Sequence, residues 1–212
     1  RPLDASHPVG LAVDLVRAHR NAGEAEVRDA VYMHAAPFTG QPVKWVDLEH
    51  RAFGVWWGRG DMAIVGSQHW NTRRERRFVA NPSNPQQPAR MIVDRNWQDN
   101  YGDPGGPIFT TTPTGHRVMM FTADGQGVYH TAVGASERGN YPFLDVMNLS
   151  TGQSRRLWRA EDPYYETVVT VLSPDGSRVL TRRETLTDAP NFFVRAFPGG
   201  QARAVTNFPD PA

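Results

Sequence analysis

A short turn pattern occurs twice in this chain and limits the folds that it can adopt. Residues 173–180 read S-P-D-G-S-R-V-L, and residues 112–119 read T-P-T-G-H-R-V-M. In each copy the proline fixes φ at the second turn position, and the glycine relieves crowding at the fourth. An apolar run precedes each turn and a β-rich run follows it. This arrangement predicts a β-hairpin, and a weaker third copy centres on Gly60, between Val55-Trp56-Trp57 and Met62-Ala63-Ile64-Val65.

Each predicted hairpin is followed by a second pair of predicted strands. These pairs are Arg73 to Ala80 with Ala89 to Val93, Phe143 to Met147 with Arg155 to Trp158, and Asn191 to Phe197 with Ala202 to Val205. The first 50 residues hold further strand candidates at Leu11 to Val16, Val27 to Ala35 and Val43 to Trp45. Units of four strands that repeat about every 50 to 60 residues are typical of a β-propeller, with one unit per blade.

The predicted fold class is therefore all-β: a partial β-propeller with about three four-stranded antiparallel blades plus part of a fourth. The predicted divisions are a partial blade at residues 1–50 and blades at residues 51–104, 105–162 and 163–212. A propeller closes with about four to eight blades, so that no long sheet edge stays exposed. We therefore expect the chain to be part of a larger propeller.

The composition and the missing motifs exclude several kinds of site. The chain has no cysteine, so it holds neither a disulfide nor a thiolate site; its compartment stays open, and a periplasmic or secreted location in a bacterium is compatible with it. A net charge of +1 and the lack of an apolar run of about 18 residues predict neither a nucleic-acid nor a membrane partner. No H-E-x-x-H, P-loop, G-x-G-x-x-G or G-x-S-x-G motif occurs, so we predict no metal, no cofactor and no catalytic residue in this chain.

Two stretches carry residues that could contact a ligand. The run Thr72 to Phe78 contains Arg73, Arg74, Arg76 and Arg77. On a strand, Arg73, Glu75 and Arg77 would share one face, while Arg74, Arg76 and Phe78 would share the other. One interpretation is a cationic wall that attracts carboxylates, because guanidinium groups bind them bidentately. The alternative is a solvated strand held by salt bridges.

The second stretch is a polar and aromatic loop from Asp94 to Pro107 that contains Arg95, Trp97 and Tyr101. Loops at the face of a scaffold often carry binding residues. The alternative is that the two aromatic side chains fill a gap between blades. A third segment, Thr131 to Pro142, is predicted to be an insertion between strands, because small residues and glycines are frequent in it.

Several longer stretches resemble the propeller of glutamyl endopeptidases, a branch of the prolyl oligopeptidase family of serine peptidases. The resemblance covers about residues 11 to 209. It rests on Val27 to Tyr32 with Ala36-Pro37-Phe38, on Arg73 to Phe78, on the Asp94 to Pro107 loop, on Gly139 to Asp145 and on Tyr164 to Val169.

The resemblance implies a two-part enzyme, in which the propeller covers an α/β-hydrolase domain that carries a Ser-Asp-His triad. Cleavage after glutamate is the activity that it implies for the whole enzyme. No residue of this chain matches a triad position, so we expect the hydrolase domain to be absent and the chain to be the C-terminal half of a propeller. The implied partners are that hydrolase domain, the remaining blades of the same protein and peptide substrates.

The leading functional hypothesis is a non-catalytic propeller portion that gates peptide access to the hydrolase domain. Residues Arg73, Arg74, Arg76, Arg77, Arg95, Trp97 and Tyr101 would guide the substrate. The alternative is a free-standing, propeller-like module that binds a protein partner.

Overall fold

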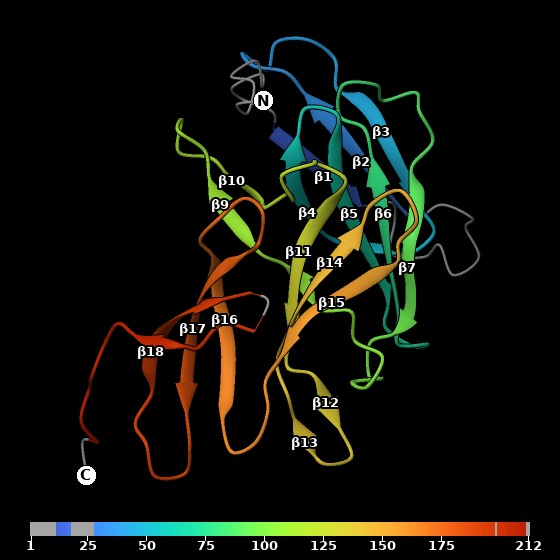
Figure 1. The fold of residues 1–212 in the computed structure, drawn as a ribbon. Helices are drawn as coiled ribbons and strands as arrows, with labels where there is room; N and C mark the ends of the chain where they lie inside the picture. Colours follow the sequence, from blue (N-terminus) through green and yellow to red (C-terminus); the bar gives the residue numbers. More distant parts are fainter. Residues whose placement is uncertain (1–11, 18–27, 198, 211–212) are drawn as a thin grey trace. The chain divides into compact units, whose positions relative to one another are not determined.

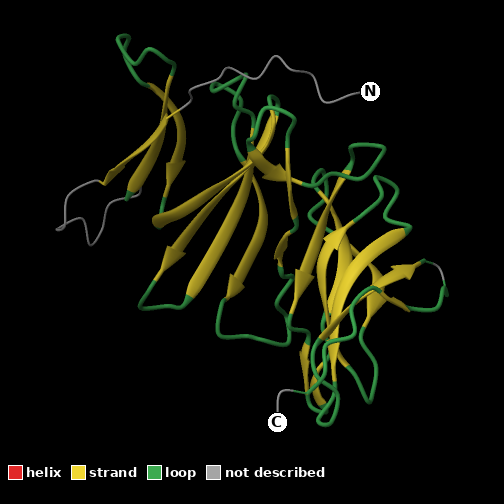
Figure 2. Ribbon diagram, turned by 90° about the vertical axis from the view of Figure 1, so that its left-hand side faces the viewer, coloured by secondary structure: helices red, strands yellow, loops and turns green. Residues whose placement is uncertain are grey.

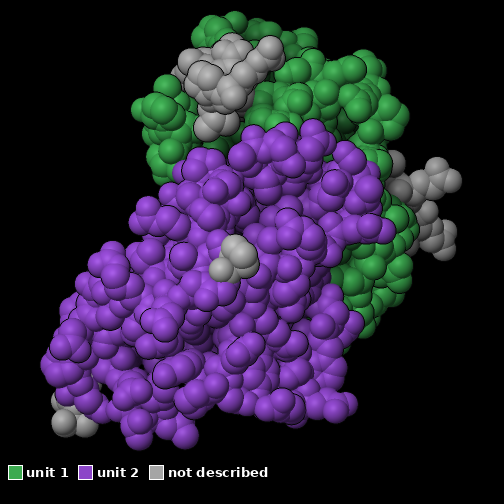
Figure 3. Space-filling view, in the orientation of Figure 1, with its two compact units in different colours: residues 1–98, 111–118 green, residues 99–110, 119–212 purple. Residues whose placement is uncertain are grey.

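The computed structural model describes residues 12–17, 28–197 and 199–210 (Figure 1). Within these ranges every regular element is a β-strand (Figure 2), and the strands pair antiparallel. The prediction of an all-β fold with antiparallel sheets is confirmed. The chain divides into two compact units, residues 1–98 with 111–118 and residues 99–110 with 119–212 (Figure 3). The described part of the chain includes no helix long and apolar enough to cross a membrane.

The first unit contains a three-stranded and a four-stranded sheet. The strands of the smaller sheet follow the order β1-β2-β3: β1 (Ala12–Arg17), β2 (Asp29–His34) and β3 (Val43–Leu48). The larger sheet is a meander of β4 (Arg51–Arg59), β5 (Met62–His69), β6 (Arg74–Ala80) and β7 (Arg90–Asn96). The hairpin predicted around Gly60 is confirmed, because Arg59 pairs with Met62 across that turn. Of the predicted strand residues, Leu11 and Val27 lie outside the described ranges.

The core of the first unit lies between these two sheets. Val31, Leu48 and Val65 are completely buried in one cluster. The rings of Trp45 and Trp57 stack there with centroids 5.7 Å apart and planes 7° apart. The indole N–H of the buried Trp45 donates a hydrogen bond to a backbone carbonyl at 3.1 Å, which satisfies its polar atom. Burial of aromatic and aliphatic side chains from both sheets therefore holds this unit together.

The second unit contains two four-stranded sheets. One has the order β15-β14-β11-β8 and consists of β8 (Gly106–Pro107), β11 (Gly127–Ala132), β14 (Phe143–Asn148) and β15 (Ser154–Arg159). The other is a meander of β16 (Tyr165–Val171), β17 (Arg178–Glu184), β18 (Asn191–Ala196) and β19 (Arg203–Ala204). Their shared core is a cluster of buried side chains: Ile108, Tyr129, Leu144, Val168, Val171 and Val179.

The strand content around residues 105–162 differs from the prediction. The hairpin predicted at Thr112 to Gly115 exists, with β9 (Phe109–Thr111) and β10 (Arg117–Met119), but it forms a separate two-stranded sheet. The expectation that the strand Phe143 to Met147 directly follows this hairpin was wrong, because β11 lies between them and pairs with β14. The residues after β10 do pair with β11: Phe121 is bridged to Val128, and the Tyr129 N–H donates to the Met120 carbonyl at 3.1 Å. The first four residues of β11 are all buried, and so are Val118 and Met119 of β10.

A further turn, at residues 122–125, lies just before β11. Residues 122–125 read T-A-D-G, and they share the aspartate and the glycine of S-P-D-G at residues 173–176, whereas the copy at 112–115 shares the proline and the glycine. In both turns the glycine N–H donates to the carbonyl of the first turn residue, at 2.8 and 2.9 Å. In both, the aspartate accepts from the N–H two residues later at 3.0 Å. These matching hydrogen bonds identify residues 122–125 as the structural counterpart of S-P-D-G.

The turn at residues 173–176 packs against β11. The hydroxyl of Tyr129, a residue only 1% exposed, donates to the carbonyl of Pro174 at 3.1 Å. Burial raises the pKa of this phenol. Gly176 has a φ of +74°, and a Cβ atom there would lie 2.6 Å from the Tyr129 hydroxyl oxygen. Both the backbone conformation and the close contact therefore require glycine.

The segment predicted to be an insertion, Thr131 to Pro142, begins inside β11 and continues as a small hairpin. Its strands are β12 (Ala135–Ser136) and β13 (Gly139–Asn140). Gly134 precedes this hairpin with a φ of +66°, and a Cβ atom there would lie 1.9 Å from the carbonyl oxygen of Tyr141. The Tyr141 N–H donates to the Gly134 carbonyl at 3.0 Å. The glycine therefore allows the two ends of the hairpin to approach each other.

Candidate functional site

One face of the arginine-rich strand β6 is held by carboxylates of the same unit. Arg74 and Arg76 lie on this face, as predicted, and both bind Asp94 on β7. Arg74 Nη2 donates to Asp94 Oδ2 at 2.7 Å, and Arg76 Nε donates to the same oxygen at 3.3 Å. Arg76 also forms an ion pair with Glu49. The hydrogen bond from Arg74 holds the pKa of Asp94 below its usual range, and the hydrogen bond from Arg76 does the same for Glu49.

The opposite face of β6 carries a buried ion pair. Arg77 Nε donates to Glu75 Oε1 at 2.6 Å, and both residues are buried. Arg95 Nη1 on β7 lies 3.8 Å from the other oxygen of Glu75. The Arg77 guanidinium also lies over the Trp56 ring, 5.2 Å from its centroid. Because these charges are paired inside the unit, Arg77 and Arg95 support the packing of the sheet.

Arg73 does not follow the alternation that the sequence predicted for it. Its φ is +57°, so it belongs to the turn that precedes β6, and the strand begins at Arg74. The placement of Arg73 on the same strand face as Arg77 was therefore wrong. Its guanidinium carbon lies 4.3 Å from the centroid of Trp70 and 5.8 Å from that of Trp97. The structure thus brings together two predicted site residues, Arg73 and Trp97, with Trp70, which the sequence analysis missed.

The predicted loop Asp94 to Pro107 is shorter than expected, because β7 continues through Asn96. The remaining segment is built by side-chain to backbone turns. The carboxylate of Asp99 accepts from the N–H groups of Tyr101 and Gly102 at 3.1 and 3.0 Å. Tyr101 belongs to the second unit and is 69% exposed. The carboxylate turns thus fix the backbone and leave this aromatic side chain at the surface.

A histidine pair lies beside the ion pairs of β6. The rings of His50 and His69 are 5.3 Å apart at an interplanar angle of 30°. His50 is only 8% exposed, and desolvation is the main reason why its pKa is lowered. The register of the β4–β5 hairpin, in which Arg51 pairs with Gln68, places these two histidines opposite each other. The pairing of His50 with His69 could therefore have been predicted from the sequence, by counting outwards from the predicted hairpin around Gly60. Among the described residues, no group of three or more potential ligands could hold a metal ion.

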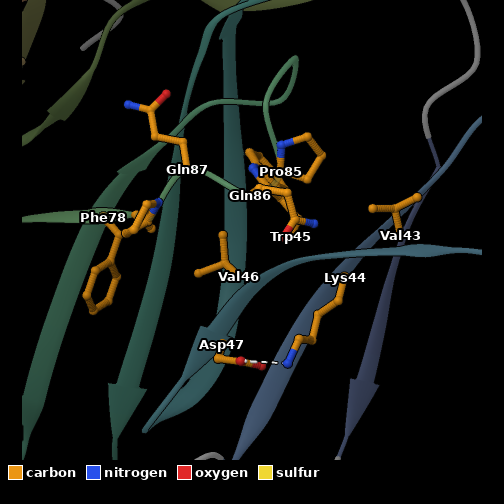
Figure 4. Close-up of a pocket in the computed structure, with 11 residues that line it drawn as sticks. Val43, Lys44, Trp45, Val46, Asp47, Phe78, Pro85, Gln86 and Gln87 are labelled. Carbon is orange, nitrogen blue, oxygen red and sulfur yellow. Dashed lines mark hydrogen bonds and ion pairs between the residues drawn. The ribbon is translucent and has the colours of Figure 1, made fainter.

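An open pocket of ≈ 410 Å³ lies in the first unit, between β3 and the segment that leads into β7 (Figure 4). Five consecutive residues of β3, Val43 to Asp47, line it, and β3 is an edge strand of its sheet. The opposite wall includes Phe78 and the segment Pro85 to Ala89. At one end Lys44 Nζ donates to Asp47 at 2.8 Å, which raises the pKa of the lysine. None of the residues predicted from the sequence to guide a substrate lines this pocket.

Comparisons with known proteins agree with the resemblance inferred from the sequence. The chain is 31% identical over 210 residues to "Probable glutamyl endopeptidase, chloroplastic" of Oryza sativa subsp. japonica, covering 91% of this chain and 22% of that protein. It is 30% identical over 203 residues to the protein of the same name from Arabidopsis thaliana, covering 89% of this chain and 21% of that protein. The chain therefore spans about a fifth of the length of these curated relatives. No family model matches it.

Among solved structures, the chain is similar to prolyl oligopeptidase B from Galerina marginata, with 12% identity and a TM-score of 0.49. The match covers 87% of this chain and 29% of that one. From the sequence similarity, the chain is related to glutamyl endopeptidases, and the resemblance stated from the sequence is confirmed.

Proposed function

We propose that this chain, a relative of part of the glutamyl endopeptidases, is a non-catalytic portion of the β-propeller of a serine peptidase. In this proposal residues 1–50 are a partial blade, and residues 51–104, 105–162 and 163–212 are blades of a larger ring. The α/β-hydrolase domain with its triad lies elsewhere in the full-length protein. The observation that carries the proposal is the sequence similarity, which extends over 91% of the chain but only 22% of the relative. The three successive four-stranded antiparallel sheets support it.

The proposed role is steric gating of the hydrolase domain. A ring of packed sheets admits an extended peptide and excludes a folded protein, so access depends on the size of the substrate. The sequence supports a non-catalytic role, because it lacks the G-x-S-x-G motif that holds the nucleophilic serine in α/β-hydrolases. Such a peptidase would act on peptide substrates, and its relatives' name points to cleavage at glutamate.

This proposal is tested by comparing the cleavage of one small protein in its native and in its unfolded form. The full-length protein should cleave a short glutamyl peptide and the unfolded form of a small protein, and it should leave the native form of that protein intact. Equal rates for the native and the unfolded forms would refute gating. In parallel, the 212-residue chain alone should not react with a fluorophosphonate probe, and covalent labelling of it would refute the non-catalytic role.

We further propose that arginine side chains near β6 guide acidic peptides towards the enzyme. The ion pairs with Glu49, Glu75 and Asp94 offset much of this charge, so the expected effect is modest. Arg74 and Arg76 are suited to a test, since their substitution leaves no buried carboxylate unpaired. Changing both to serine in the full-length protein should lower kcat/KM for a glutamyl peptide at low salt, and less at high salt. An unchanged kcat/KM at low salt would exclude guidance by these two residues.

A further inference from the structure

Two tryptophans and one arginine gather at one end of the β4–β7 sheet. Strands β6 and β7 are neighbours in this sheet (Figure 1). Trp70 and Arg73 lie in the turn between β5 and β6, and Trp97 follows β7, so the pairing of Arg74 with Asn96 brings the three residues together. The two indole rings are 5.8 Å apart and tilted by 40°. Trp70 is 67% exposed, which is unusual for the largest apolar side chain. These three residues are the W-R-W cluster.

The backbone holds Arg73 firmly in this cluster. Its N–H donates to the Trp70 carbonyl at 3.2 Å, and its Nη1 donates to the same oxygen at 2.9 Å. Its own carbonyl accepts from the Trp97 N–H at 2.9 Å. The φ of +57° is uncommon for a residue other than glycine, asparagine or aspartate, and such conformations are frequent at binding sites. These hydrogen bonds hold the guanidinium group over the Trp70 ring, 4.3 Å from its centroid, and beside the Trp97 ring, 5.8 Å from its centroid.

Arg73 differs from the other arginines of its run in having no carboxylate partner. Arg74, Arg76 and Arg77 each form an ion pair with a residue of the same unit. Within the described parts of the chain, Arg73 forms no ion pair, and its side chain makes one hydrogen bond, to a carbonyl. A guanidinium group has five N–H donors, so most of them are available to a ligand. The cluster thus offers a positive, planar donor edge beside an exposed apolar surface.

We propose that the W-R-W cluster is a binding site for a polypeptide segment in which an acidic residue is next to an aromatic or apolar one. The carboxylate would accept hydrogen bonds from the Arg73 guanidinium, and the neighbouring side chain would pack on the exposed ring of Trp70. Tryptophan and arginine are the residues that most often dominate protein–protein interfaces. Arg73 and Trp97 are also among the residues expected to guide a substrate, but the binding proposed here does not require the peptidase activity.

The charges around the cluster favour a peptide over a nucleic acid. Stacked aromatic rings with an arginine can also bind the bases of a single strand. Binding of the phosphate backbone, however, needs several unpaired cations along the groove. Here the neighbouring Arg74 and Arg76 are paired with Asp94 and Glu49, and the whole chain has a net charge of only +1. A single unpaired guanidinium group matches one carboxylate better than a row of phosphates.

The indole N–H signals of the 212-residue chain, observed by NMR, test the proposal. The probe is the peptide acetyl-Gly-Glu-Phe-Gly-amide, with acetyl-Gly-Gln-Phe-Gly-amide as its uncharged match. We expect the glutamate peptide to shift the signals of Trp70 and Trp97, assigned with W70F and W97F, with a Kd on the order of 1 mM. The glutamine peptide should bind about fivefold more weakly or worse, because it cannot form the charged hydrogen bonds.

Matched variants separate the ligand contact from a loss of structure. R73N keeps a residue that tolerates positive φ and removes the guanidinium group, so it should abolish the preference for glutamate. R203Q removes an exposed arginine of the second unit and should leave binding unchanged. W70A, at an exposed position, should weaken the binding of both peptides.

Three results would overturn the proposal. They are equal binding of the two peptides, wild-type binding by R73N with unchanged remaining indole signals, and shifts confined to the other four tryptophans. If an oligothymidylate of eight nucleotides bound at Trp70 more tightly than the glutamate peptide, the cluster would be a nucleic-acid site and the peptide proposal would be wrong. The readout is binding to the isolated chain. A negative result would therefore overturn the binding proposal and leave the test of gating unaffected.

Discussion

Replacement of Gly176 by alanine tests the packing of the S-P-D-G turn on β11. Gly176 has a φ of +74°, where an alanine costs roughly 1–2 kcal/mol. The new Cβ would also lie 2.6 Å from the hydroxyl oxygen and 2.9 Å from a ring carbon of Tyr129. Because Tyr129 is buried, its ring cannot turn towards solvent, and the overlap should add about 1–3 kcal/mol. We therefore expect G176A to lower the free energy of unfolding by about 2–5 kcal/mol.

The chain offers a control at Gly115. It also has a positive φ, of +87°, in a related turn, but a Cβ atom there would meet nothing within 4 Å. G115A should therefore cost only the backbone component, roughly 1–2 kcal/mol. Urea denaturation followed by far-UV circular dichroism measures both variants. At an m-value of about 2–3 kcal/mol/M, the midpoint should fall by about 1–2 M for G176A and by about 0.5 M for G115A.

Tyr129 supplies a second check on the same reasoning. Y129F removes the oxygen nearest to the new methyl group and also the hydrogen bond to Pro174, worth about 1 kcal/mol. In the double variant Y129F/G176A the clash is partly relieved, so the loss should be smaller than the sum of the single losses by about 1 kcal/mol. Equal losses for G176A and G115A, or strict additivity with Y129F, would refute the argument from close contact.

Two further predictions concern carboxylates of the second unit. Glu166 is 2% exposed and accepts hydrogen bonds from Thr181 at 2.5 Å and Arg195 at 2.7 Å, so E166Q should cost about 2–4 kcal/mol in urea denaturation, by leaving a partly buried guanidinium unpaired. E184Q, at the more exposed pair with Arg182, should cost less than about 1 kcal/mol, and equal losses would contradict the argument from burial. Hydrogen bonds, first from the Ser173 side chain and then from Ser177, lower the pKa of Asp175 to about 2, below an unfolded value of about 3.9. Its stabilising effect should therefore be complete above about pH 5 and disappear as the pH falls from about 4 to 2, so the urea midpoints of wild type and D175N should converge over that range; a constant difference would refute it.

The hairpins were predictable from the sequence because their cause is local. A proline or small residue, an aspartate and a glycine in the right order build the turn, whatever the rest of the chain does. The same rule, applied to T-A-D-G at residues 122–125, would also have located β11. The placement of β9 and β10 in a separate sheet could not be predicted in this way, since it depends on which segment pairs with β14, and that partner, β11, is joined to β14 by a long connection.

In the candidate site, too, the local pattern was predictable and the contacts between distant residues were not. The alternation of Arg74 with Glu75 and of Arg76 with Arg77 followed from the period of a strand. Their partners did not, because Asp94 and Glu49 are about 20 to 30 residues away in the chain and are brought close only by the sheet.

Three properties could be predicted from the residues alone: the all-β fold, the hairpin turns around Gly60, Gly115 and Gly176, and the resemblance to part of the glutamyl endopeptidases. These properties depend on the conformational limits of single residues and on short patterns. Only the folded sheet shows which arginines of the run 73–77 pair with carboxylates, and that Arg73, which forms no ion pair within the described residues, lies against Trp70 and Trp97. Charge pairing depends on distances across strands, and those distances exist only once the sheet has formed.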